Sequence, residues 1–297
     1  MLQHAHQDPV RPSRVVVLGS SGFIGSHLLE HLAASGVDRL GVSRADVDLA
    51  EPAAADALKA RTTKDDTVVL ISCLTRDKGE SLAVFMRNLA MAQSVGALLE
   101  TRGVKHLVYL SSDAVYPDAL ALAREDSPLG PGGLYGQAHV AREAMLAYSA
   151  AKAGVPLAIL RPCAVFGPGD THNGYGPNRF LRTAEKDGKI ALFGGGEETR
   201  EHVFVDDVCR LIGLCAAHGD TGVVNVAPGR GHTFAQVAEA AAQAAARPVA
   251  IEPSPRRSPI THRRYDVSAL LKAYPSFAFT SLEEGLKRMA GQAAAAR

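Results

Sequence analysis

The sequence predicts an α/β protein in which a doubly wound parallel sheet is followed by a smaller C-terminal α/β lobe. Three observations support this fold class. Short apolar runs typical of strands alternate with longer helical patterns over the first half of the chain. A glycine-spaced turn joins the first run to the first helical pattern, and after residue 166 the glycine and proline content rises while the alternation ends. Alternating strands and helices form βαβ units, whose strands pair in parallel.

The expected elements follow this alternation. In the first part, strands are expected over residues 14–18, 39–42, 67–72, 105–110 and 157–160, and helices over 23–34, 53–60, 81–101 and 134–153. In the second part, helices are expected over 178–187, 206–218, 234–246 and 282–289, and strands over 190–192, 202–205 and 223–226. We therefore predict a disordered tail over 1–13, a first domain over 14–166 to which later segments return, and a lobe mainly over 167–297.

Composition limits the possible functions. The 297 residues carry 32 Lys and Arg against 31 Asp and Glu, so no overall field gathers nucleic acid or an anionic membrane. We expect no membrane contact, because no uninterrupted apolar segment approaches the ~20 residues of a span and the first residues are polar. The four cysteines lack Cys-x-x-Cys spacing, which indicates neither a metal site nor a disulfide framework. A cytoplasmic location is expected.

A glycine-spaced turn follows the first predicted strand. Gly19 permits a tight turn, Gly22 lets backbone N–H groups approach a pyrophosphate, and Gly25 lets the helix pack closely on the strand. The N-terminal end of that helix favours anions. The Gly-x-x-Gly-x-x-Gly spacing therefore predicts a dinucleotide site in a Rossmann-type domain, with a plain structural turn as the alternative.

Further motifs occur in a fixed order along the chain. They are Asn88, Ser-Ser-x-x-Val-Tyr at 111–116, a tyrosine-centred helix start at 135–139, Arg161-Pro162, Phe-Gly-Pro-Gly at 166–169, and 200–207. With the glycine turn, this series resembles the extended short-chain dehydrogenases/reductases of the NAD-dependent epimerase/dehydratase family. The resemblance runs from about Arg14 to residues 282–286.

The resemblance implies a catalytic pair. In this family a tyrosine hydroxyl exchanges a proton with the substrate while hydride passes to or from the nicotinamide, and the matching residue is Tyr135. Ser112 matches the serine or threonine that hydrogen-bonds the reacting oxygen. Free tyrosine has a pKa of ~10 and is a poor base at neutral pH, so the site needs nearby positive charge. The structural alternatives are a core tyrosine at a helix start and a serine at a strand end.

His139 departs from the family pattern. The family places lysine four residues after the tyrosine, where it binds the nicotinamide ribose and lowers the tyrosine pKa, and here that position is His139. A histidinium could perform both tasks, and a neutral imidazole could still hold the ribose hydroxyls. The alternative interpretation is that catalysis has been lost and only cofactor binding persists.

The end of the second strand indicates the cofactor. Members that prefer NAD place an acidic residue there, whereas this chain has Ser43 and Arg44, which suit the 2′-phosphate of NADP. We therefore expect NADP in preference to NAD, with a solvated surface arginine as the alternative. By resemblance, further cofactor contacts fall to the following residues: Phe23 and Ile24 in the glycine turn, Asp48, Leu49 and Asn88.

The resemblance also implies a nucleotide-sugar substrate and a homodimer. Substrate contacts are expected from Ser112, Asp113, Asn178, Arg200 and Arg264, with Arg179 and Arg257 as further candidates. The family commonly pairs the helices matched here by 81–101 and 134–153 into a four-helix bundle. His172 and His202 lack metal-ligand spacing and are expected to be structural.

Two classes of function remain open. The first is oxidation or reduction of a sugar hydroxyl or keto group, as in an epimerase or a net reductase. Elimination of water is disfavoured, because Ala114 stands where the family's dehydratases have a carboxylate. The second is a non-catalytic NAD(P)-binding sensor or partner protein, for which His139 is the main argument.

Overall fold

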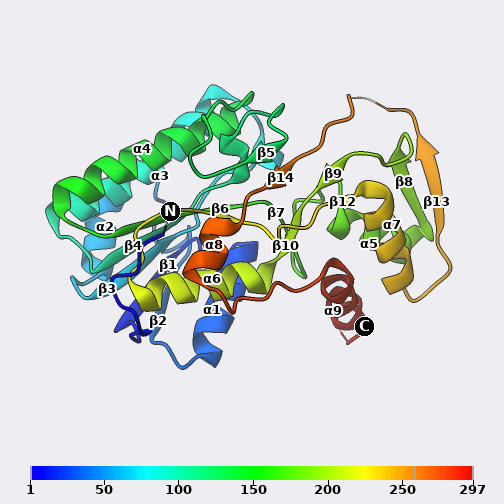
Figure 1. The fold of residues 1–297 in the computed structure, drawn as a ribbon. Coiled ribbons are helices and arrows are strands. Elements are labelled where there is room, and N and C mark those ends of the chain that lie inside the picture. Colours follow the sequence, from blue (N-terminus) through cyan, green and yellow to red (C-terminus); the bar gives the residue numbers. More distant parts are fainter. Residues whose placement is uncertain (1, 257–258, 296–297) are drawn as a thin grey trace.

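A six-stranded parallel sheet forms the centre of the larger domain. The structure is a computed structural model that describes residues 2–256 and 259–295. The strands lie in the order β11-β6-β4-β3-β1-β2, and each neighbouring pair is parallel (Figure 1). Their bounds are β1 Arg14–Leu18, β2 Arg39–Val42, β3 Asp66–Leu70, β4 His106–Leu110, β6 Leu157–Pro162 and β11 Gly222–Val226.

Alternate side chains of β1 pack on opposite layers of helices. Val15 and Val17 join one core cluster with Leu28 of α1, whereas Val16 and Leu18 join another with Leu98 of α3. The first layer contains α1 Phe23–Ala34 and α6 Val205–His218; the second contains α2 Ala54–Arg61, α3 Leu82–Thr101 and α4 Leu134–Ala153. This two-sided burial explains why the strands are apolar throughout, and it confirms the predicted Rossmann-type α/β fold class.

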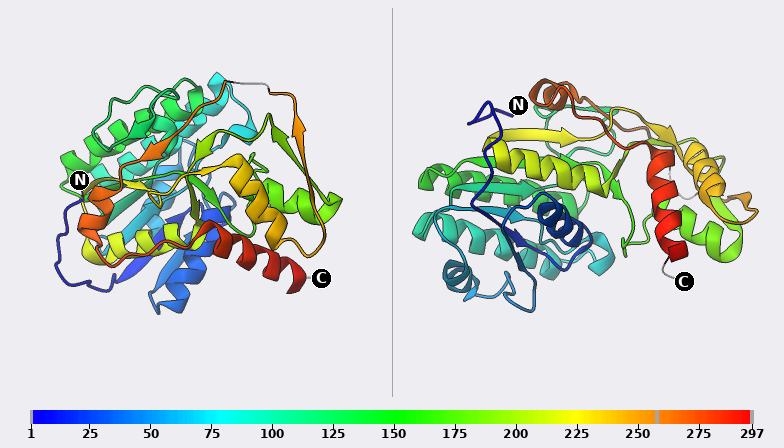
Figure 2. Two further views of the ribbon diagram at one scale, coloured as in Figure 1. Left: turned by 45° about the vertical axis from the view of Figure 1, so that its right-hand side comes forward. Right: turned by 90° about the horizontal axis from the view of Figure 1, so that it is seen from below.

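The smaller lobe has its own core, formed from Phe180, Phe234, Leu286 and their neighbours. Figure 2 shows it beside the carboxyl end of the parallel sheet. Its helices are α5 Pro177–Asp187, α7 Phe234–Ala244 and α9 Leu282–Ala295. Its strand pairs are β7 Ala164–Phe166 with β10 His202–Phe204, β8 Lys189–Phe193 with β13 Ala250–Ser254, and β9 Thr199–Arg200 with β12 His232–Thr233.

Short elements connect the two parts. β5 Leu122–Ala123 pairs with β14 Arg264–Tyr265, and the short helix α8 Ser268–Ala273 packs against β11. Two 3-10 turns lie at η1 Arg76–Lys78 and η2 Asp113–Val115. Both follow strands of the sheet at its carboxyl edge, so they stand where a ligand of this fold binds.

The chain crosses between the two parts more than once after residue 167. The strand expected at 223–226 pairs with β6 in the main sheet, and α6 packs on α1. Both segments therefore belong to the first domain. β13 is not among the strands expected from the sequence. This strand is largely exposed and contains Pro253, so it carries no alternating apolar pattern.

Residues 2–13, expected as a disordered tail, pack along the molecule instead. Gln3 forms a β-bridge with Thr221, and Val10 N donates to Ala217 O. The His4 Nδ1 atom lies 2.6 Å from Asp220 Oδ1. The segment is polar because its partners are backbone groups and a buried carboxylate, which hydrophobic pattern analysis does not detect.

Among the described residues, α3 has the length and apolar composition that a membrane span requires. Arg87 and Asn88 interrupt its apolar residues, so this finding does not contradict the expectation that no uninterrupted apolar segment approaches the length of a span. Its buried positions include Val95, Leu98 and Leu99, which join the core beneath the sheet, and the helix packs along α4. These contacts are those of a core helix.

Candidate active site

The turn between β1 and α1 requires glycine for steric reasons. Gly19 has φ +100°, and a Cβ at Gly25 would lie 2.1 Å from the Gly19 carbonyl oxygen. Gly22 N donates to Gly19 O at 3.1 Å, which closes the turn just before α1 begins at Phe23. The turn therefore brings bare backbone to the N-terminus of a helix, which fits the pyrophosphate of a dinucleotide.

Charged side chains gather at the end of β2. Asp46 Oδ2 accepts from both the backbone N and the hydroxyl of Ser43, at 2.9 and 2.6 Å. The side chain of Arg44 is 73% exposed and its Nε lies 3.0 Å from Asp48 Oδ2. Asp48 also binds Arg87 Nη2 at 2.8 Å, so it keeps a partner if Arg44 turns to another anion.

Asn88 fixes the segment that follows β3. Its Oδ1 accepts from Leu74 N at 2.8 Å and its Nδ2 donates to Leu74 O at 3.0 Å. Asn88 is buried, and both polar atoms of its side-chain amide form hydrogen bonds within the protein. The structure thus gives Asn88 a positioning role beside the expected cofactor path.

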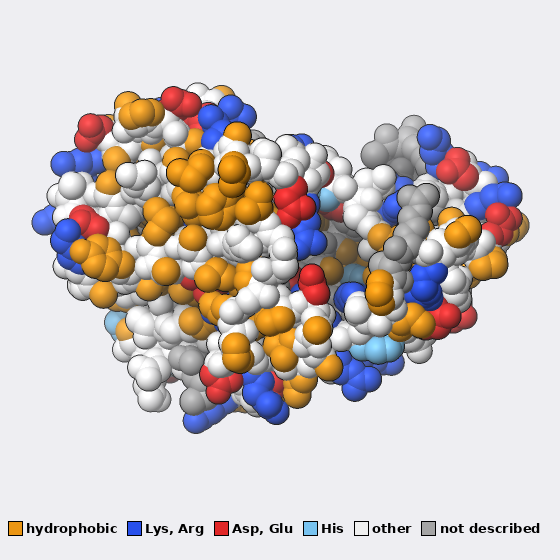
Figure 3. All heavy atoms as spheres, turned by 90° about the horizontal axis from the view of Figure 1, so that it is seen from above, with side chains coloured by type: hydrophobic (Ala, Val, Ile, Leu, Met, Phe, Trp, Pro, Cys, Tyr) orange, Lys and Arg blue, Asp and Glu red, His pale blue; other side chains and the backbone are white. Residues whose placement is uncertain are grey.

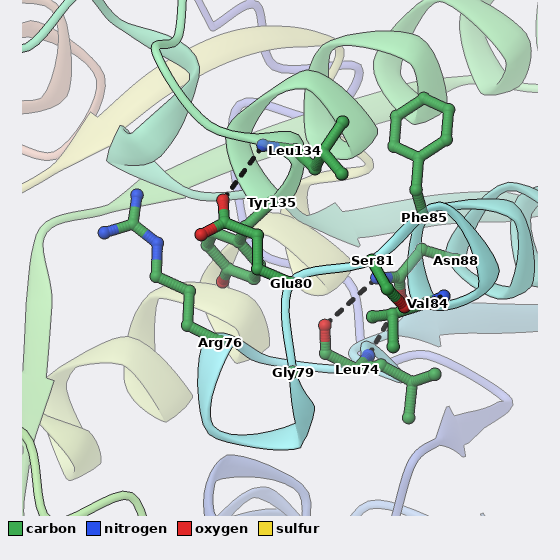
Figure 4. Close-up of a pocket in the computed structure, with 10 residues that line it drawn as sticks. All are labelled: Leu74, Arg76, Gly79, Glu80, Ser81, Val84, Phe85, Asn88, Leu134 and Tyr135. Carbon is green, nitrogen blue, oxygen red and sulfur yellow. Dashed lines mark hydrogen bonds between the residues drawn. The ribbon is translucent and has the colours of Figure 1, made fainter.

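Tyr135 is the second residue of α4 and lies beneath the loop that follows β3. Glu80 Oε1 accepts from Leu134 N at 3.0 Å and so satisfies the start of the helix (Figure 4). The Arg76 guanidinium carbon lies 5.4 Å from the centre of the Tyr135 ring. Burial raises the pKa of Tyr135, and Cys73 adds to this increase, whereas the Ser112 side chain and the charge of Arg142 lower it.

Ser112 and Asp113 stand at the end of β4. The Ser112 hydroxyl accepts from Ala114 N at 3.1 Å and donates to Asp113 Oδ1 at 3.3 Å. Asp113 Oδ2 accepts a hydrogen bond from Tyr265 OH and lies 3.7 Å from Arg263 Nη1. Asp113 is therefore held by groups that come from the far end of the chain.

His139 lies one turn after Tyr135 and is 2% exposed. Its Nδ1 lies 2.7 Å from Tyr109 OH, and its Nε2 lies 3.5 Å from Cys73 Sγ. Burial lowers the pKa of His139 well below its usual value, and the charge of Arg142 lowers it further. Of the two states considered from the sequence, the structure therefore favours the neutral imidazole.

Two arginines face Asp113 from the second half of the chain. Arg200 donates to Thr261 O at 2.7 Å and to Thr261 Oγ1 at 2.6 Å. Arg263 is 8% exposed and donates to Pro117 O at 2.9 Å, whereas Arg264 is exposed. Successive residues point to opposite sides of β14, so the structure favours Arg263 over Arg264 as the group that faces the site. Arg257 lies outside the described residues.

Asn178 has no free amide group. Its Oδ1 accepts from Gly167 N at 3.1 Å, and its Nδ2 donates to Asp170. His172 also binds Asp170, with Nδ1 2.7 Å from Oδ1, and reaches Thr75 Oγ1 at 2.9 Å. These contacts join the smaller lobe to the loop after β3, and Figure 3 shows the surface hollowed between the two parts. Arg179 is exposed, and His202 is buried.

Four further residues near the site carry no motif that marks them in the sequence: Cys73, Tyr109, Arg142 and Arg263. Charged residues on a helix usually face solvent, so a pattern search gives Arg142 no special weight. A usable signal was present nonetheless, because positions 135, 139 and 142 follow the i, i+4, i+7 spacing of one helix face.

The fold and the glycine turn together define a dinucleotide-binding α/β protein with a second lobe over the carboxyl edge of its sheet. Residues 15–227 match the model of the NAD dependent epimerase/dehydratase family. The chain belongs to this family, as its ordered motifs indicated.

Named relatives are nucleotide-sugar or lipid-linked sugar epimerases. The chain is 28% identical to N-acetyl-alpha-D-glucosaminyl-diphospho-ditrans,octacis-undecaprenol 4-epimerase of Escherichia coli O157:H7, over 67% of this chain and 61% of that protein. It is 25% identical to ADP-L-glycero-D-manno-heptose-6-epimerase of Alkalilimnicola ehrlichii, over 92% and 95%. UDP-glucose 4-epimerase of Thermus thermophilus in complex with NAD has the same fold, with TM-score 0.81, 24% identity and coverage of 96% and 100%.

Proposed function

We propose that the protein is an NAD(P)-dependent oxidoreductase or epimerase that acts on a sugar hydroxyl or keto group of a nucleotide sugar. The observation that carries this proposal is that Ser112, at the end of β4, and Tyr135, at the start of α4, stand on elements that pack together at the same sheet edge as the glycine turn. A plain structural turn gives no reason for these groups to meet there.

Tyr135 is the proposed acid and base. The glycine turn would hold the dinucleotide, whose nicotinamide would supply the acceptor and donor of hydride. Tyr135 takes the proton from the sugar hydroxyl during oxidation and gives one back during reduction. Ser112 hydrogen-bonds the reacting oxygen and orients it toward the phenol. Glu80 fixes the helix start on which Tyr135 stands.

Arg200 and Arg263 are the proposed partners of the substrate diphosphate. Arg263 is buried beside Asp113 and Arg200 is partly buried; burial lowers the pKa of Arg200, with the charge of Arg263 adding to the effect. An anion between two crowded cations relieves this repulsion. The relatives' names include UDP and ADP sugars, which carry such a diphosphate.

NADP is the proposed preferred cofactor, with NAD as the alternative. Arg44 is exposed and its partner Asp48 keeps Arg87, so Arg44 is available for a 2′-phosphate. Asp46 would instead favour a free ribose, but Ser43 already occupies the Oδ2 atom of its carboxylate. The Thermus enzyme was solved with NAD.

We also propose a homodimer in the cytoplasm. Leu82 and Met86 on α3 are 70% and 58% exposed, and Tyr148 on α4 is 67% exposed. A second copy of the same two helices would cover these side chains. Light scattering at micromolar concentration measures the mass, and a monomer would contradict the dimer.

The test is a change in nicotinamide absorbance on adding nucleotide sugars to the protein with NADP or NAD, together with product analysis for an epimer. Tyr135→Phe should reduce turnover by about a hundredfold or more while cofactor affinity is retained, because only the proton-transfer hydroxyl is removed. His139→Lys, which restores the family residue, should keep or raise turnover.

Equal turnover in Tyr135→Phe and the unaltered protein would overturn the assignment of Tyr135. Cofactor binding without turnover on any nucleotide sugar, in both the unaltered protein and His139→Lys, would favour the second candidate. That candidate is a non-catalytic NAD(P)-binding sensor or partner, and the neutral His139 is the observation that supports it.

A further inference from the structure

Arg142 is a buried cation without a carboxylate partner among the residues that the structure describes. Its side chain has no exposed surface. The Nη2 atom donates to Ser72 O at 2.6 Å, while Nε and Nη1 have no hydrogen-bond partner within the described residues. The adjacent carboxylate, Glu143, binds Arg161 instead. A lone buried charge is costly, so its retention calls for a role that a neutral side chain lacks.

The surroundings of Arg142 lead to the Tyr135 site. Its guanidinium carbon lies 5.1 Å from the centre of the Tyr109 ring, and Tyr109 OH binds His139. The His139 ring lies 4.8 Å from the Tyr135 ring at a near-perpendicular angle. Helical side chains tilt toward the N-terminus of their helix, so the arginine reaches back toward position 135. Neutral groups thus fill the space between the cation and the phenol.

We propose that Arg142 is a positioning residue for the reaction: its fixed positive charge, acting across His139 and Cys73, stabilises the ionised form of Tyr135. The inference rests on the proposed function of Tyr135 as an acid and base. Because the Arg142 side chain has no exposed surface, its charge is screened less by solvent and salt than the charge of a surface lysine.

Other charged and titratable groups also face Tyr135. The loop after β3 contributes Cys73 and Arg76, and the end of β4 contributes Asp113. Asp113 is held by Tyr265 and lies near Arg263, which limits its repulsion of a phenolate. Arg76 lies over the face of the ring. Arg142 is the cation on Tyr135's own helix face, and its charge opposes the effect of burial.

The experiment titrates position 135 in the protein without cofactor or substrate. A difluorotyrosine in place of Tyr135 is more acidic than tyrosine and gives a fluorine NMR signal, so its ionisation is measured in the folded protein. In Arg142→Gln the midpoint should rise by roughly one pH unit or more. In Arg142→Lys, which keeps the charge, most of this rise should be absent.

Lys152→Gln is the matched control. It removes one positive charge from the exposed end of the same helix, where Lys152 pairs with Glu100. Its midpoint should equal that of the unaltered protein. Circular dichroism checks the fold of each variant, and if Arg142→Gln is not folded, Arg142→Met, which keeps an apolar stem, replaces it.

An unchanged midpoint in a folded neutral variant, or an equal rise in Lys152→Gln, would overturn the proposal. A second readout is the pH profile of sugar oxidation, in which Tyr135 acts as the base: the neutral variant should lose kcat with little change in KM, and its acidic limb should move to higher pH. Loss of kcat without either shift would assign Arg142 a purely structural role. The titration needs no turnover, so failure of the proposed function leaves its result intact.

Discussion

Two buried arginines, Arg142 on α4 and Arg161 on β6, show how differently the same side chain can be used. Arg161 binds Glu143 through two nitrogens, Nε at 2.9 Å and Nη2 at 2.7 Å, and both side chains are nearly inaccessible. Arg142 is at least as buried but has a single backbone acceptor, Ser72 O. In the first arrangement, the carboxylate of Glu143 neutralises the charge of Arg161. The second leaves a net charge inside the domain, beside the tyrosine that the proposed chemistry needs.

Removing the partner of Arg161 should produce the largest loss of stability. Glu143→Ala leaves Arg161 without its two acceptor oxygens and Ser111 without its acceptor. Breaking a buried pair from one side costs about 3–5 kcal/mol. Chemical denaturation with circular dichroism measures this loss, and a change below about 1 kcal/mol would show that the pair is not structurally important.

An exposed arginine extends the comparison to the surface. Arg44 is mostly in solvent, so Arg44→Ala should leave the free energy of unfolding nearly unchanged. Loss of the Arg44 guanidinium should instead weaken NADPH binding by about tenfold or more, because a charge-assisted contact contributes ~1.5–3 kcal/mol. The affinity for NADH should not change. Fluorescence titration of both nucleotides measures this. Equal affinities in the unaltered protein would contradict the NADP assignment.

The neutral His139 predicts a pH dependence of stability. The pKa of His139 is lowered in the folded protein, so below about pH 6.5 the unfolded chain binds a proton that the folded chain does not. Stability therefore falls as pH falls through this range, by up to about 1.4 kcal/mol per unit. His139→Gln should remove this part of the slope. Denaturation at several pH values compares the two, and parallel slopes would indicate that His139 is charged when folded.

The smallest effect is expected for Arg142→Met. Replacing an unpartnered buried charge by an apolar chain of similar length should change stability by less than about 1 kcal/mol, or even increase it. The same change at Arg161 should be strongly destabilising, because Glu143 would be left unpaired. If both variants lose the same stability, the two arginines do not differ in the way described.

Local pattern predicted the parts of the fold that depend on local sequence. The observed bounds of β1 and α1, with the glycine turn between them, are those expected from the apolar spacing. The apolar pattern of a strand and that of a helix can be told apart within a few residues. The placement of β11 was harder, since its partner β6 lies some sixty residues earlier and only packing brings them together. The packed segment at 2–13 depends on backbone bonds to residues near 220, which leave no periodic signal.

The candidate site likewise contains residues that the sequence motifs predicted and residues whose placement depends on the packing of the chain. Ser112 and Tyr135 stand on elements that pack together, and the family motifs carry both residues in order, so the sequence could propose their roles, which stay predictions. By contrast, Asn178 is occupied by Gly167 and Asp170, and Arg263 rather than Arg264 faces inward. Those outcomes depend on loop conformation and on the alternation of side chains where the chain enters β14 at Arg264. The burial of Arg142 likewise depends on how α4 lies over the sheet, which its own sequence does not reveal.

The N-terminal segment, residues 2–13, connects parts of the molecule that are far apart in the sequence. His4 touches Asp220 through Nδ1 and the carbonyl of Ala273 through Nε2, while Tyr274 binds the same carboxylate. Trimming the chain to begin at Arg14 would leave Asp220, which has no exposed surface, without its imidazole partner. The damage from such a cut would thus appear beside α8, nearly the whole chain length away from the residues removed.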